Sequence, residues 1–415
     1  MTYATCFDRP YLQTPVLHAT ILYLYAFGGD SAVIMVHARM ATLFLGTTSP
    51  AGQRCLVRRS CSTSANKRGQ RKLSLASRLG LDPSKNKFHA PLVYHENYSF
   101  QNWPPNHTFP MDKFERIAHA LLSSLVEATT ASQQRPLVRS PDDFFRPFDV
   151  EHIPYEDWFF SIMDRDYVTR FLEGMLTEKE SRPIGFRDQT GRPELIERTV
   201  LEVAGTVLAC QLALEWGIAS NVAGGTHHAG PTAGAGYTIL NDLAVASHVF
   251  LTDNASGIRN VLVVDCDVHQ GDGTAKFCIP GMSTLSLHCQ SNYPLRKAES
   301  TYDVGIHDGC GDEEYLRILE HAVNEAIDEV RPDLVLYDAG VDVYTKDRLG
   351  RLDISEEGIR SRDRWVLEKC VAGGIPVAAV VGGGYDRDVD ALARRHAIVH
   401  EECAHVWRKY SMWDR

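Results

Sequence analysis

Four acid or imidazole side chains stand within eight residues, directly after an apolar segment. The segment VLVV occupies positions 261–264, and Asp265, Asp267, His269 and Asp272 follow it. A short apolar, β-branched run of this kind is typical of a buried strand in a parallel sheet. Carboxylates and imidazoles at the end of such a strand are expensive to bury without partners. The stretch therefore predicts a metal site, with proton-transfer groups beside it, where a strand ends.

Three residues fit the ligand set of that site. Asp267 and His269 are spaced i, i+2, so on an extended segment their side chains project to the same side. A third ligand has to come from another strand end, and Asp342 stands two residues after Gly340, which follows the strand-like segment LVLYDA. One His and two Asp leave positions open for water and substrate, as catalytic zinc sites do. Polar residues that only cap strand ends are the alternative interpretation.

A pair of neighbouring histidines lies in the glycine-rich segment GGTHHAGPTAGAGY, at His227 and His228. Adjacent residues cannot both face a metal in the same way. Imidazole titrates near neutral pH, so the pair suits proton transfer beside the metal. Each ring needs a partner on its other nitrogen, and Asp265 and Asp272 remain available for this role. Either histidine alone could equally be a hydrogen-bonded core residue.

A tyrosine, Tyr385, follows an apolar run and three glycines in VVGGGYDRD. A phenol at this place could donate a hydrogen bond to the oxyanion of a tetrahedral intermediate. A tyrosine that closes a turn is the alternative. The chain contains neither a GxSxG segment nor a P-loop, so the sequence gives no support to a serine hydrolase or an NTPase.

Apolar runs and helical stretches alternate along the second half of the chain. The expected strands are residues 260–265, 283–288, 333–338 and 376–381, preceded by a short strand at 92–94. The expected helices are residues 196–216, 312–330 and 355–371, with another from about Met111, and residues 132–149 read as a polar surface loop. Strands that alternate with helices indicate a parallel sheet covered on both faces. We therefore expect one three-layer α/β domain whose sheet is mostly parallel.

The net charge of −10 is unevenly distributed. Residues 1–89 carry twelve Lys and Arg against three Asp, or +9, which leaves −19 for residues 90–415. An acidic body argues against direct nucleic-acid binding, since that requires a basic face. It suits a cationic substrate such as a lysine-rich tail, although a merely solvated acidic surface explains it as well.

The first 89 residues differ in composition from the rest. No acidic residue occurs between Ser31 and Leu81, where Arg, Lys, Ser and Thr are frequent. This composition indicates a transit peptide for a plastid or mitochondrion, if translation starts at Met35 or Met40 rather than Met1. A disordered basic tail is the alternative, with the nucleus or cytoplasm as the location. The uncharged run from Leu12 to Gly29 contains Pro, His and two Gly and makes a poor membrane span, and the ten cysteines form no disulfide framework.

Several ordered motifs resemble those of the histone deacetylase superfamily, and most closely its class IV members and their bacterial relatives. The resemblance extends from about Pro91 to His400 and is carried by VYHENYS, HTFPMDKF, GGTHHAG, GYTILNDLAVA, VLVVDCDVHQGDGT, SNYPLRK, DAGVDVYTKDRLGRL and GGGYDRD. It implies an arginase-like α/β fold and a deacetylase domain over residues 90–415. Close relatives tend to have Arg where this chain has Thr108, which puts the exit route of the by-product in doubt.

The resemblance also implies roles for single residues. Asp267, His269 and Asp342 would bind one catalytic Zn²⁺, or Fe²⁺ in the cell. His228 would be the general base and then the general acid, with His227 as its electrostatic companion. The other implied residues are Asp272 and Asp265 as orienting carboxylates, Tyr385 as oxyanion donor, Gly236 and Tyr237 in the acyl-lysine tunnel, and a structural K⁺ near Asp265, Asp267, His269, Ser286 and Leu287.

The implied reaction is hydrolysis of N6-acyl-lysine in histone tails or other proteins. An acetylpolyamine or long-chain acyl-lysine amidohydrolase is the nearest alternative. A binuclear ureohydrolase of the same fold would need a second carboxylate two residues after His269, where Gly271 stands. A non-catalytic binding module would be favoured by loss of His228, Tyr385 or a ligand, and all are present.

Overall fold

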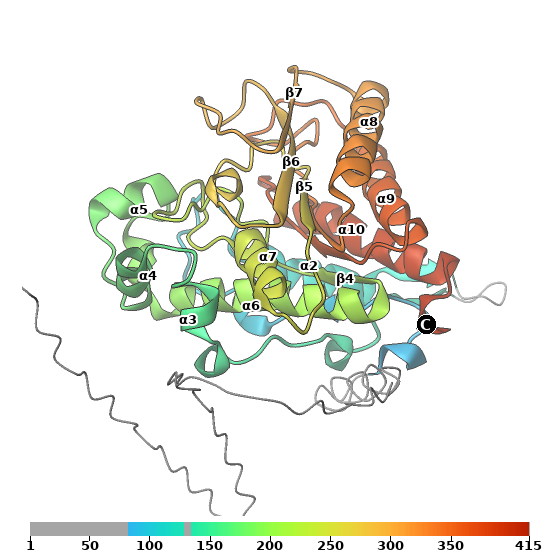
Figure 1. Cartoon of the computed structure of the whole chain (residues 1–415), viewed down its shortest axis with the longest axis horizontal. Coiled ribbons are helices and arrows are strands. Elements are labelled where there is room, and N and C mark those ends of the chain that lie inside the picture. The colour runs from blue at the N-terminus through green and yellow to red at the C-terminus, as the bar shows by residue number, and fades with distance from the viewer. Residues whose placement is uncertain (1–81, 128–133, 415) are drawn as a thin grey trace, which may run out of the picture. The chain divides into compact units, whose positions relative to one another are not determined.

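The computed structural model describes residues 82–127 and 134–414 (Figure 1). The predicted basic extension, residues 1–89, therefore lies outside the described residues as far as position 81. Residues 82–89 belong to the folded domain. They include the 3₁₀ helix η1 (Pro83–Lys85), and the carbonyl oxygens of Asn86 and Phe88 accept hydrogen bonds from the side chains of Trp407 and Arg408, at 2.8 and 2.7 Å. Residues 86 and 88 are thus bonded to the helix α10 near the end of the described chain.

A seven-stranded sheet forms the centre of the domain, and all its neighbouring strands are parallel. In spatial order the strands are β1 (Leu92–Val93), β4 (Ile218–Asn221), β9 (Val377–Val380), β8 (Leu334–Asp338), β5 (Val261–Asp265), β6 (Met282–Cys289) and β7 (Tyr302–Ile306). The residues of β4, β5, β8 and β9 are all buried, as expected for strands covered on both faces. In the edge strand β7, half-buried and exposed residues alternate, and only the last residue, Ile306, is buried.

Two helices, α6 (Pro193–Trp216) and α7 (Asp242–Thr252), cover one face of the sheet. Proline starts α6, where a missing N–H costs nothing. The helix ends at Gly217 with φ of 89°, a left-handed conformation that glycine adopts without strain. The end of the helix expected at residues 196–216 is therefore confirmed.

The length and composition of α6 would also permit it to cross a membrane. However, 83% of its most apolar 18-residue window is buried within the fold. The helix packs on β4, β9 and α7, so its apolar character is explained by its central place in the domain.

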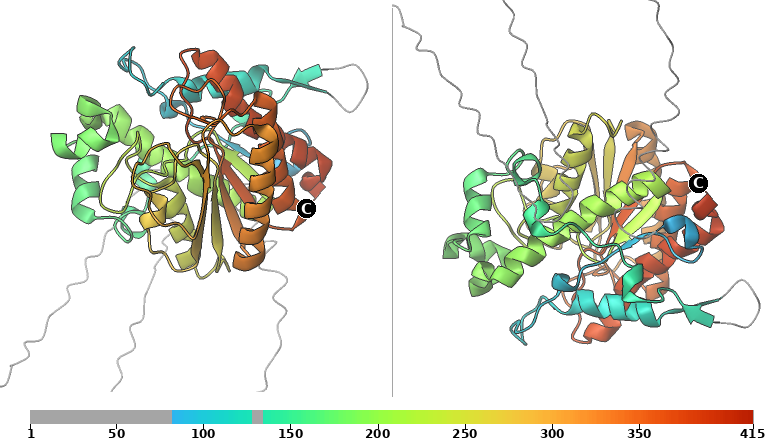
Figure 2. Two further views of the ribbon diagram at one scale, coloured as in Figure 1. Left: turned by 90° about the horizontal axis from the view of Figure 1, so that it is seen from above. Right: turned by 90° about the horizontal axis from the view of Figure 1, so that it is seen from below.

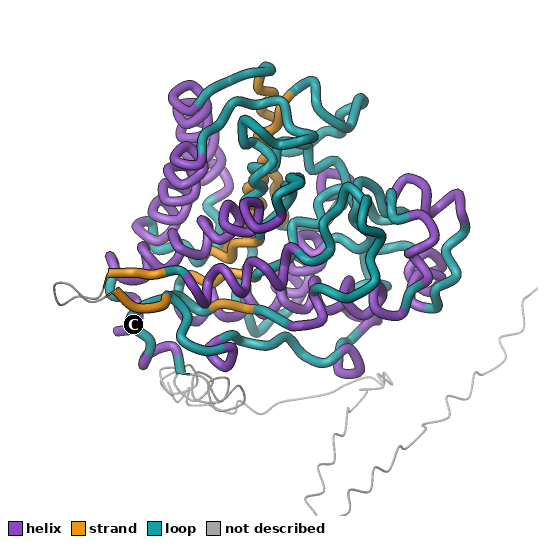
Figure 3. Tube along the Cα trace, turned by 180° about the vertical axis from the view of Figure 1, so that it is seen from behind, coloured by secondary structure: helices purple, strands orange, loops and turns teal. Residues whose placement is uncertain are grey.

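The opposite face is covered by α8 (Asp312–Val330), α9 (Glu356–Ala372) and α10 (Val389–Lys409), with α2 (Lys113–Ser123) packed on α10. Figure 2 shows the strands between these two helical layers. The predicted three-layer α/β architecture is confirmed, and the sheet is parallel throughout. Figure 3 shows the helices around the central strands and the loops that join them.

Smaller elements lie around this core. They are the helices α3 (Tyr155–Trp158), α4 (Arg165–Leu172) and α5 (Glu178–Ile184), the antiparallel pair β2 (Leu125–Glu127) and β3 (Gln134–Pro136), and the 3₁₀ helices η2 (Glu96–Tyr98), η3 (Pro141–Asp143), η4 (Val150–His152), η5 (Arg187–Gly191), η6 (Thr274–Lys276) and η7 (Met412–Asp414).

The prediction of a surface loop at residues 132–149 was wrong for part of the segment. It includes β3, and Leu137, Val138, Phe144 and Phe145 are buried. The backbone N–H of Phe145 also donates to Leu92 at the end of the sheet. Four apolar side chains scattered among polar ones follow neither the helix nor the strand period, so the pattern could not reveal their burial.

Candidate active site

Side chains from two adjacent strand ends form a cluster of ligand atoms. Asp267 and His269 follow β5, and Asp342 follows the neighbouring strand β8. His269 Nδ1 lies 3.0 Å from Asp267 Oδ1 and 3.1 Å from Asp342 Oδ2. One ligand atom from each residue lies within 4.8 Å of the other two, and all three residues are buried. The structure thus brings the three predicted ligands together.

The backbone holds both carboxylates of this cluster. Gly383 N–H donates to Asp267 Oδ2 at 2.7 Å, and Val268 N–H donates to Asp342 Oδ1 at 2.8 Å. Each carboxylate therefore keeps its other oxygen for His269 or for a metal. A Cβ atom at Gly383 would lie 2.4 Å from Asp342 Oδ2, which explains why glycine is needed at this position. One imidazole nitrogen and two carboxylate oxygens, with both carboxylates held by backbone N–H groups, fit a divalent ion such as zinc.

The charges of the cluster also suit a cation. Burial, and then the charge of Asp267, raises the pKa of Asp342 to about 6. Burial alone would lower the pKa of His269, but its hydrogen bonds to Asp267 and Asp342 raise this pKa to about 10. The carboxylates of Asp267 and Asp342 thus stabilise a protonated, positively charged His269. A metal ion can take the place of this proton and supply the positive charge instead.

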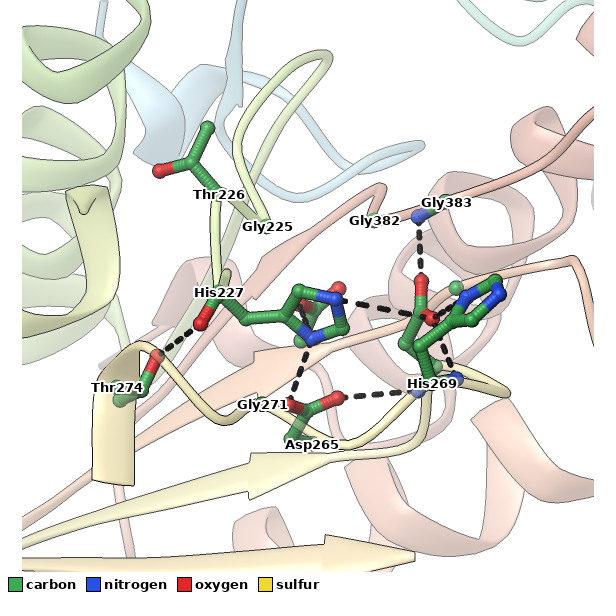
Figure 4. A network of polar contacts seen from close by, with 12 residues as sticks. Gly225, Thr226, His227, Asp265, His269, Gly271, Thr274, Gly382 and Gly383 are labelled. Carbon is green, nitrogen blue, oxygen red and sulfur yellow. Dashed lines mark hydrogen bonds and ion pairs between the residues drawn. The ribbon is translucent and has the colours of Figure 1, made fainter. Parts of the chain in front are cut away.

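His227 and His228 follow β4 and are each bonded to a carboxylate. His227 Nδ1 lies 2.8 Å from Asp265 Oδ2, and His228 Nδ1 lies 2.8 Å from Asp272 Oδ1. Figure 4 shows His227 beside Asp265, with its carbonyl oxygen held by Thr274. Both predicted carboxylate partners therefore lie beside the two rings.

The two rings, 4.2 Å apart, differ in protonation. Burial opposes a charge on His227, yet Asp265 and Asp267 raise its pKa well above the usual value. Burial, and then the charge of His227, lowers the pKa of His228 to about 3. Next to a cationic His227, His228 is therefore a neutral ring. The hydrogen bond to Asp272 occupies its Nδ1, so Nε2 is the nitrogen that can accept a proton.

Tyr385 follows β9, which lies between β4 and β8 in the sheet. Its ring centroid is 6.4 Å from that of His269 and 5.8 Å from that of Tyr237. Burial, and then the carboxylates of Asp267 and Asp342, raises the pKa of its phenol well above 10. The phenol is consequently protonated and able to donate a hydrogen bond.

Gly236 and Tyr237 border His228. Gly236 has φ of 54°, and a Cβ atom there would lie 2.3 Å from His228 Cδ2. Tyr237 also has a positive φ, 66°. Its ring stacks on Phe186 with centroids 5.8 Å apart, and His107 and Phe109 lie against it. Thr108 stands between His107 and Phe109 in the sequence.

Three residues beside the site were not predicted. The ring of Tyr293 stands edge-on to His228, with centroids 4.9 Å apart, and is 46% exposed. Asp347 Oδ2 accepts the backbone N–H of Tyr385 at 2.7 Å. Asp338, at the end of β8, lies 3.8 Å from His227 Nδ1, and neither of its carboxylate oxygens has a hydrogen-bond donor among the described residues. All three stand in motifs that carried the resemblance, which was the available signal.

The residues that the resemblance implies for a potassium ion also meet. Asp265 and Ser286 are partners in the β5–β6 register, and Leu287 follows Ser286 on β6. Gly271 N–H lies 3.4 Å from Ser286 Oγ, so the loop that contains His269 passes over the end of β6.

Comparison with known proteins agrees with this geometry. The histone deacetylase domain family matches residues 112–401. An uncharacterised protein of Picosynechococcus sp. is 41% identical over 319 residues, which are 76% of this chain and 99% of that protein. Histone deacetylase 2 of Arabidopsis thaliana is 30% identical over 336 residues, 76% of this chain and 79% of the relative.

The fold is shared with a solved structure as well. The crystal structure of the HD domain of HDA15 superposes with a TM-score of 0.57 at 20% sequence identity, and the match covers 77% of this chain and 89% of that one. At this identity the likeness concerns the fold alone. The family match over most of the chain, together with the relative in Arabidopsis, shows that this protein belongs to the histone deacetylase family.

Proposed function

We propose that the protein is a zinc-dependent amidohydrolase that removes acetyl groups from lysine side chains of histones or other proteins. One observation carries the proposal: an Asp–His–Asp cluster shares a buried site with two His–Asp pairs and a protonated phenol. These are the groups that metal-assisted amide hydrolysis needs: ligands, a base that can return its proton, and an oxyanion donor.

Asp267, His269 and Asp342 would hold the zinc ion. When bound, zinc polarises the amide carbonyl and acidifies a water molecule. The ligand set has two anionic oxygens and one neutral nitrogen, which leaves at least one position for water or substrate.

The remaining chemistry falls to side chains of the chain. His228 Nε2 accepts the proton of the attacking water, and Asp272 holds the ring through Nδ1. His227, kept cationic by Asp265, stabilises negative charge that develops beside it. Tyr385 donates a hydrogen bond to the oxyanion. His228 then returns its proton to the departing lysine amine, so no covalent bond forms between protein and substrate.

The interior beyond the site favours a short acyl group. A cavity of about 30 Å³ is lined by His228 and Tyr385 on the side of the site and also by Lys113, Arg198 and Glu202. Lys113 is buried, and its Nζ donates to the carbonyl of Gly382 at 3.0 Å. A long hydrocarbon chain would have to displace charged groups that are costly to desolvate. We therefore infer that acetyl is preferred over long acyl chains.

The assay compares acyl donors on the purified, zinc-loaded full-length chain. An acetyl-lysine peptide from a histone tail should be hydrolysed faster than its long-chain acyl counterpart or an acetylpolyamine. Asp342→Ala should lose both zinc and activity, because ligand removal acts on binding and on chemistry. Faster turnover of the polyamine or of the long acyl chain would reassign the substrate. If the zinc-loaded protein hydrolyses none of these three acyl donors, the proposed amidohydrolase activity is refuted.

A further inference from the structure

A second cluster of metal-binding side chains lies outside the active site, where β7 leads into α8. His307 and Cys310 belong to the connecting loop, and Glu314 lies in the first turn of α8. One ligand atom from each residue lies within 4.8 Å of the other two. None of the three takes part in the proposed hydrolysis, so the cluster requires a separate explanation.

The Nε2 nitrogen of His307 faces the carboxylate of Glu314. Nδ1 lies 2.9 Å from the carbonyl oxygen of Asp308, which can only accept, so Nδ1 carries a proton. Nε2 lies 3.1 Å from Glu314 Oε2. A neutral imidazole nitrogen and a carboxylate oxygen are both acceptors, so this pair needs either a second ring proton or a cation between them.

The third group, Cys310, adds a soft ligand to the same place. The residue is buried, while His307 and Glu314 are 62% and 47% exposed at their side chains. A thiol beside a carboxylate does not ionise readily by itself, whereas a metal ion removes its proton. Sulfur, imidazole nitrogen and carboxylate oxygen are together the ligands of zinc.

We propose that His307, Cys310 and Glu314 form a second zinc site, with water in the fourth position. Zinc bonds of about 2.0–2.3 Å imply separations of roughly 3.3–3.8 Å between tetrahedral ligands. The three ligand atoms lie within 4.8 Å of one another, so none of their separations exceeds this range by more than about 1 Å. Asp312 and Glu313, also in the first turn of α8, add negative charge around the site.

The site would strengthen a loop that leads toward Tyr385. Gly309 N–H donates to the carbonyl of Arg351 at 2.8 Å, and Asp353 N–H donates to that of Cys310 at 2.9 Å. Arg351 and Asp353 belong to the same loop as Asp347, whose carboxylate accepts a hydrogen bond from the backbone N–H of Tyr385. The role of this zinc is therefore structural: it holds the loop after β7 against the segment that positions the phenol.

Cobalt provides a readout that the catalytic site cannot imitate. A Co²⁺–thiolate bond gives a charge-transfer band in the near ultraviolet, and the catalytic ligands include no sulfur. Full-length protein titrated with Co²⁺ should develop this band, and added Zn²⁺ should abolish it. Cys310→Ser should remove the band, whereas Cys278→Ser, at an exposed free cysteine, should retain it. Asp342→Ala should also retain it, which separates this site from the catalytic one.

Two results would overturn the proposal. If the band is absent from the wild-type protein, or persists in Cys310→Ser, the cluster is only a surface His–Glu pair beside a buried thiol. If His307→Ala leaves the cobalt affinity unchanged, the metal is bound by thiols without the proposed site. Neither result bears on hydrolysis of acyl-lysine, which is measured separately.

Discussion

At the scale of single residues, surroundings rather than residue type decide what each histidine can do. His227 and His228 are adjacent and both bonded to carboxylates, yet their pKa values shift in opposite directions. His227 has three carboxylates near it, from Asp265, Asp267 and Asp338. His228 has one, and faces the charge of His227. A cation and a neutral base side by side thus arise from two identical side chains.

Tyr385→Phe tests the phenol. The ring should still pack, and zinc should still bind, because no contact of the ligand cluster involves the phenolic oxygen. We expect kcat to fall on the order of 10²–10³-fold, the usual effect of losing one oxyanion donor. Steady-state kinetics with metal analysis on the same sample measure both quantities. An unchanged kcat would reduce Tyr385 to a residue that closes a turn.

Zinc affinity should depend on pH in two steps. Zinc binds the deprotonated ligands, so it must displace the proton from His269, with a pKa of about 10, and below about pH 6 also that of Asp342. Lowering the pH should therefore weaken binding about tenfold per unit between pH 8 and 7, and more steeply below pH 6. Titration against a competing chelator measures this slope. Affinity that stays constant from pH 8 to pH 5 would contradict the assignment of the ligands.

The ligands and the two His–Asp pairs could be predicted because their spacing expresses chemistry within short motifs. Asp347 and Asp338 could not, because their roles depend on contacts with distant segments. Asp347 acts on the backbone of Tyr385, and a backbone N–H has no sequence signature. Tyr293 stands in a polar loop whose path toward His228 is set by the fold.

At the scale of elements, helical periodicity and continuous apolar runs predicted the structure well, whereas segments of mixed polarity did not. The helix expected at residues 312–330 is α8 itself, and the strands expected in the second half of the chain are β5, β6, β8 and β9. The strands β4, with the sequence IASN, and β7, with the sequence YDVGI, mix polar and apolar residues and lack the continuous apolar run that identified β5, β8 and β9. Whether a short apolar run pairs with a neighbour is decided by the assembled sheet.

The loop after β9 gives the prediction at this scale. Gly383→Ala should weaken zinc binding strongly, because its Cβ would lie 2.4 and 2.5 Å from carboxylate oxygens of Asp342 and Asp267. Gly230→Ala is the matched control in the loop after β4, since the atoms nearest its Cβ are 3.7 Å away. Zinc content and activity should both fall in the first variant and remain in the second. Equal zinc content in both variants would show that the loop after β9 can shift to make room for the added methyl group.

At the scale of the whole molecule, the two ends of the described domain are joined. The carbonyls of Asn86 and Phe88 are bonded to side chains near the end of α10. A chain that starts at Asp82 should therefore fold and hydrolyse acyl-lysine, since it contains every proposed catalytic group. A chain that starts at Ala90 loses both hydrogen bonds, at about 1 kcal/mol each, and should unfold several degrees lower.

Thermal unfolding of the two truncated chains, beside the full-length protein, checks this expectation. Equal stability of the two would mean that residues 82–89 only lie on the surface. An inactive or insoluble chain from Asp82 would show that residues 1–81 contribute to the fold.

The place of β9 has a consequence for how the protein is made. This strand is the last of the seven to leave the ribosome, yet it is inserted between β4 and β8. Without it, the strands β1 and β4 have no partner that connects them to β8, β5, β6 and β7: the histidine pair follows the first group, and the metal ligands follow the second. Joining them brings Gly383 and Tyr385 into place in the same event, because both follow β9 within a few residues. Synthesis from the N-terminus thus keeps a nascent chain inactive until its sheet is closed.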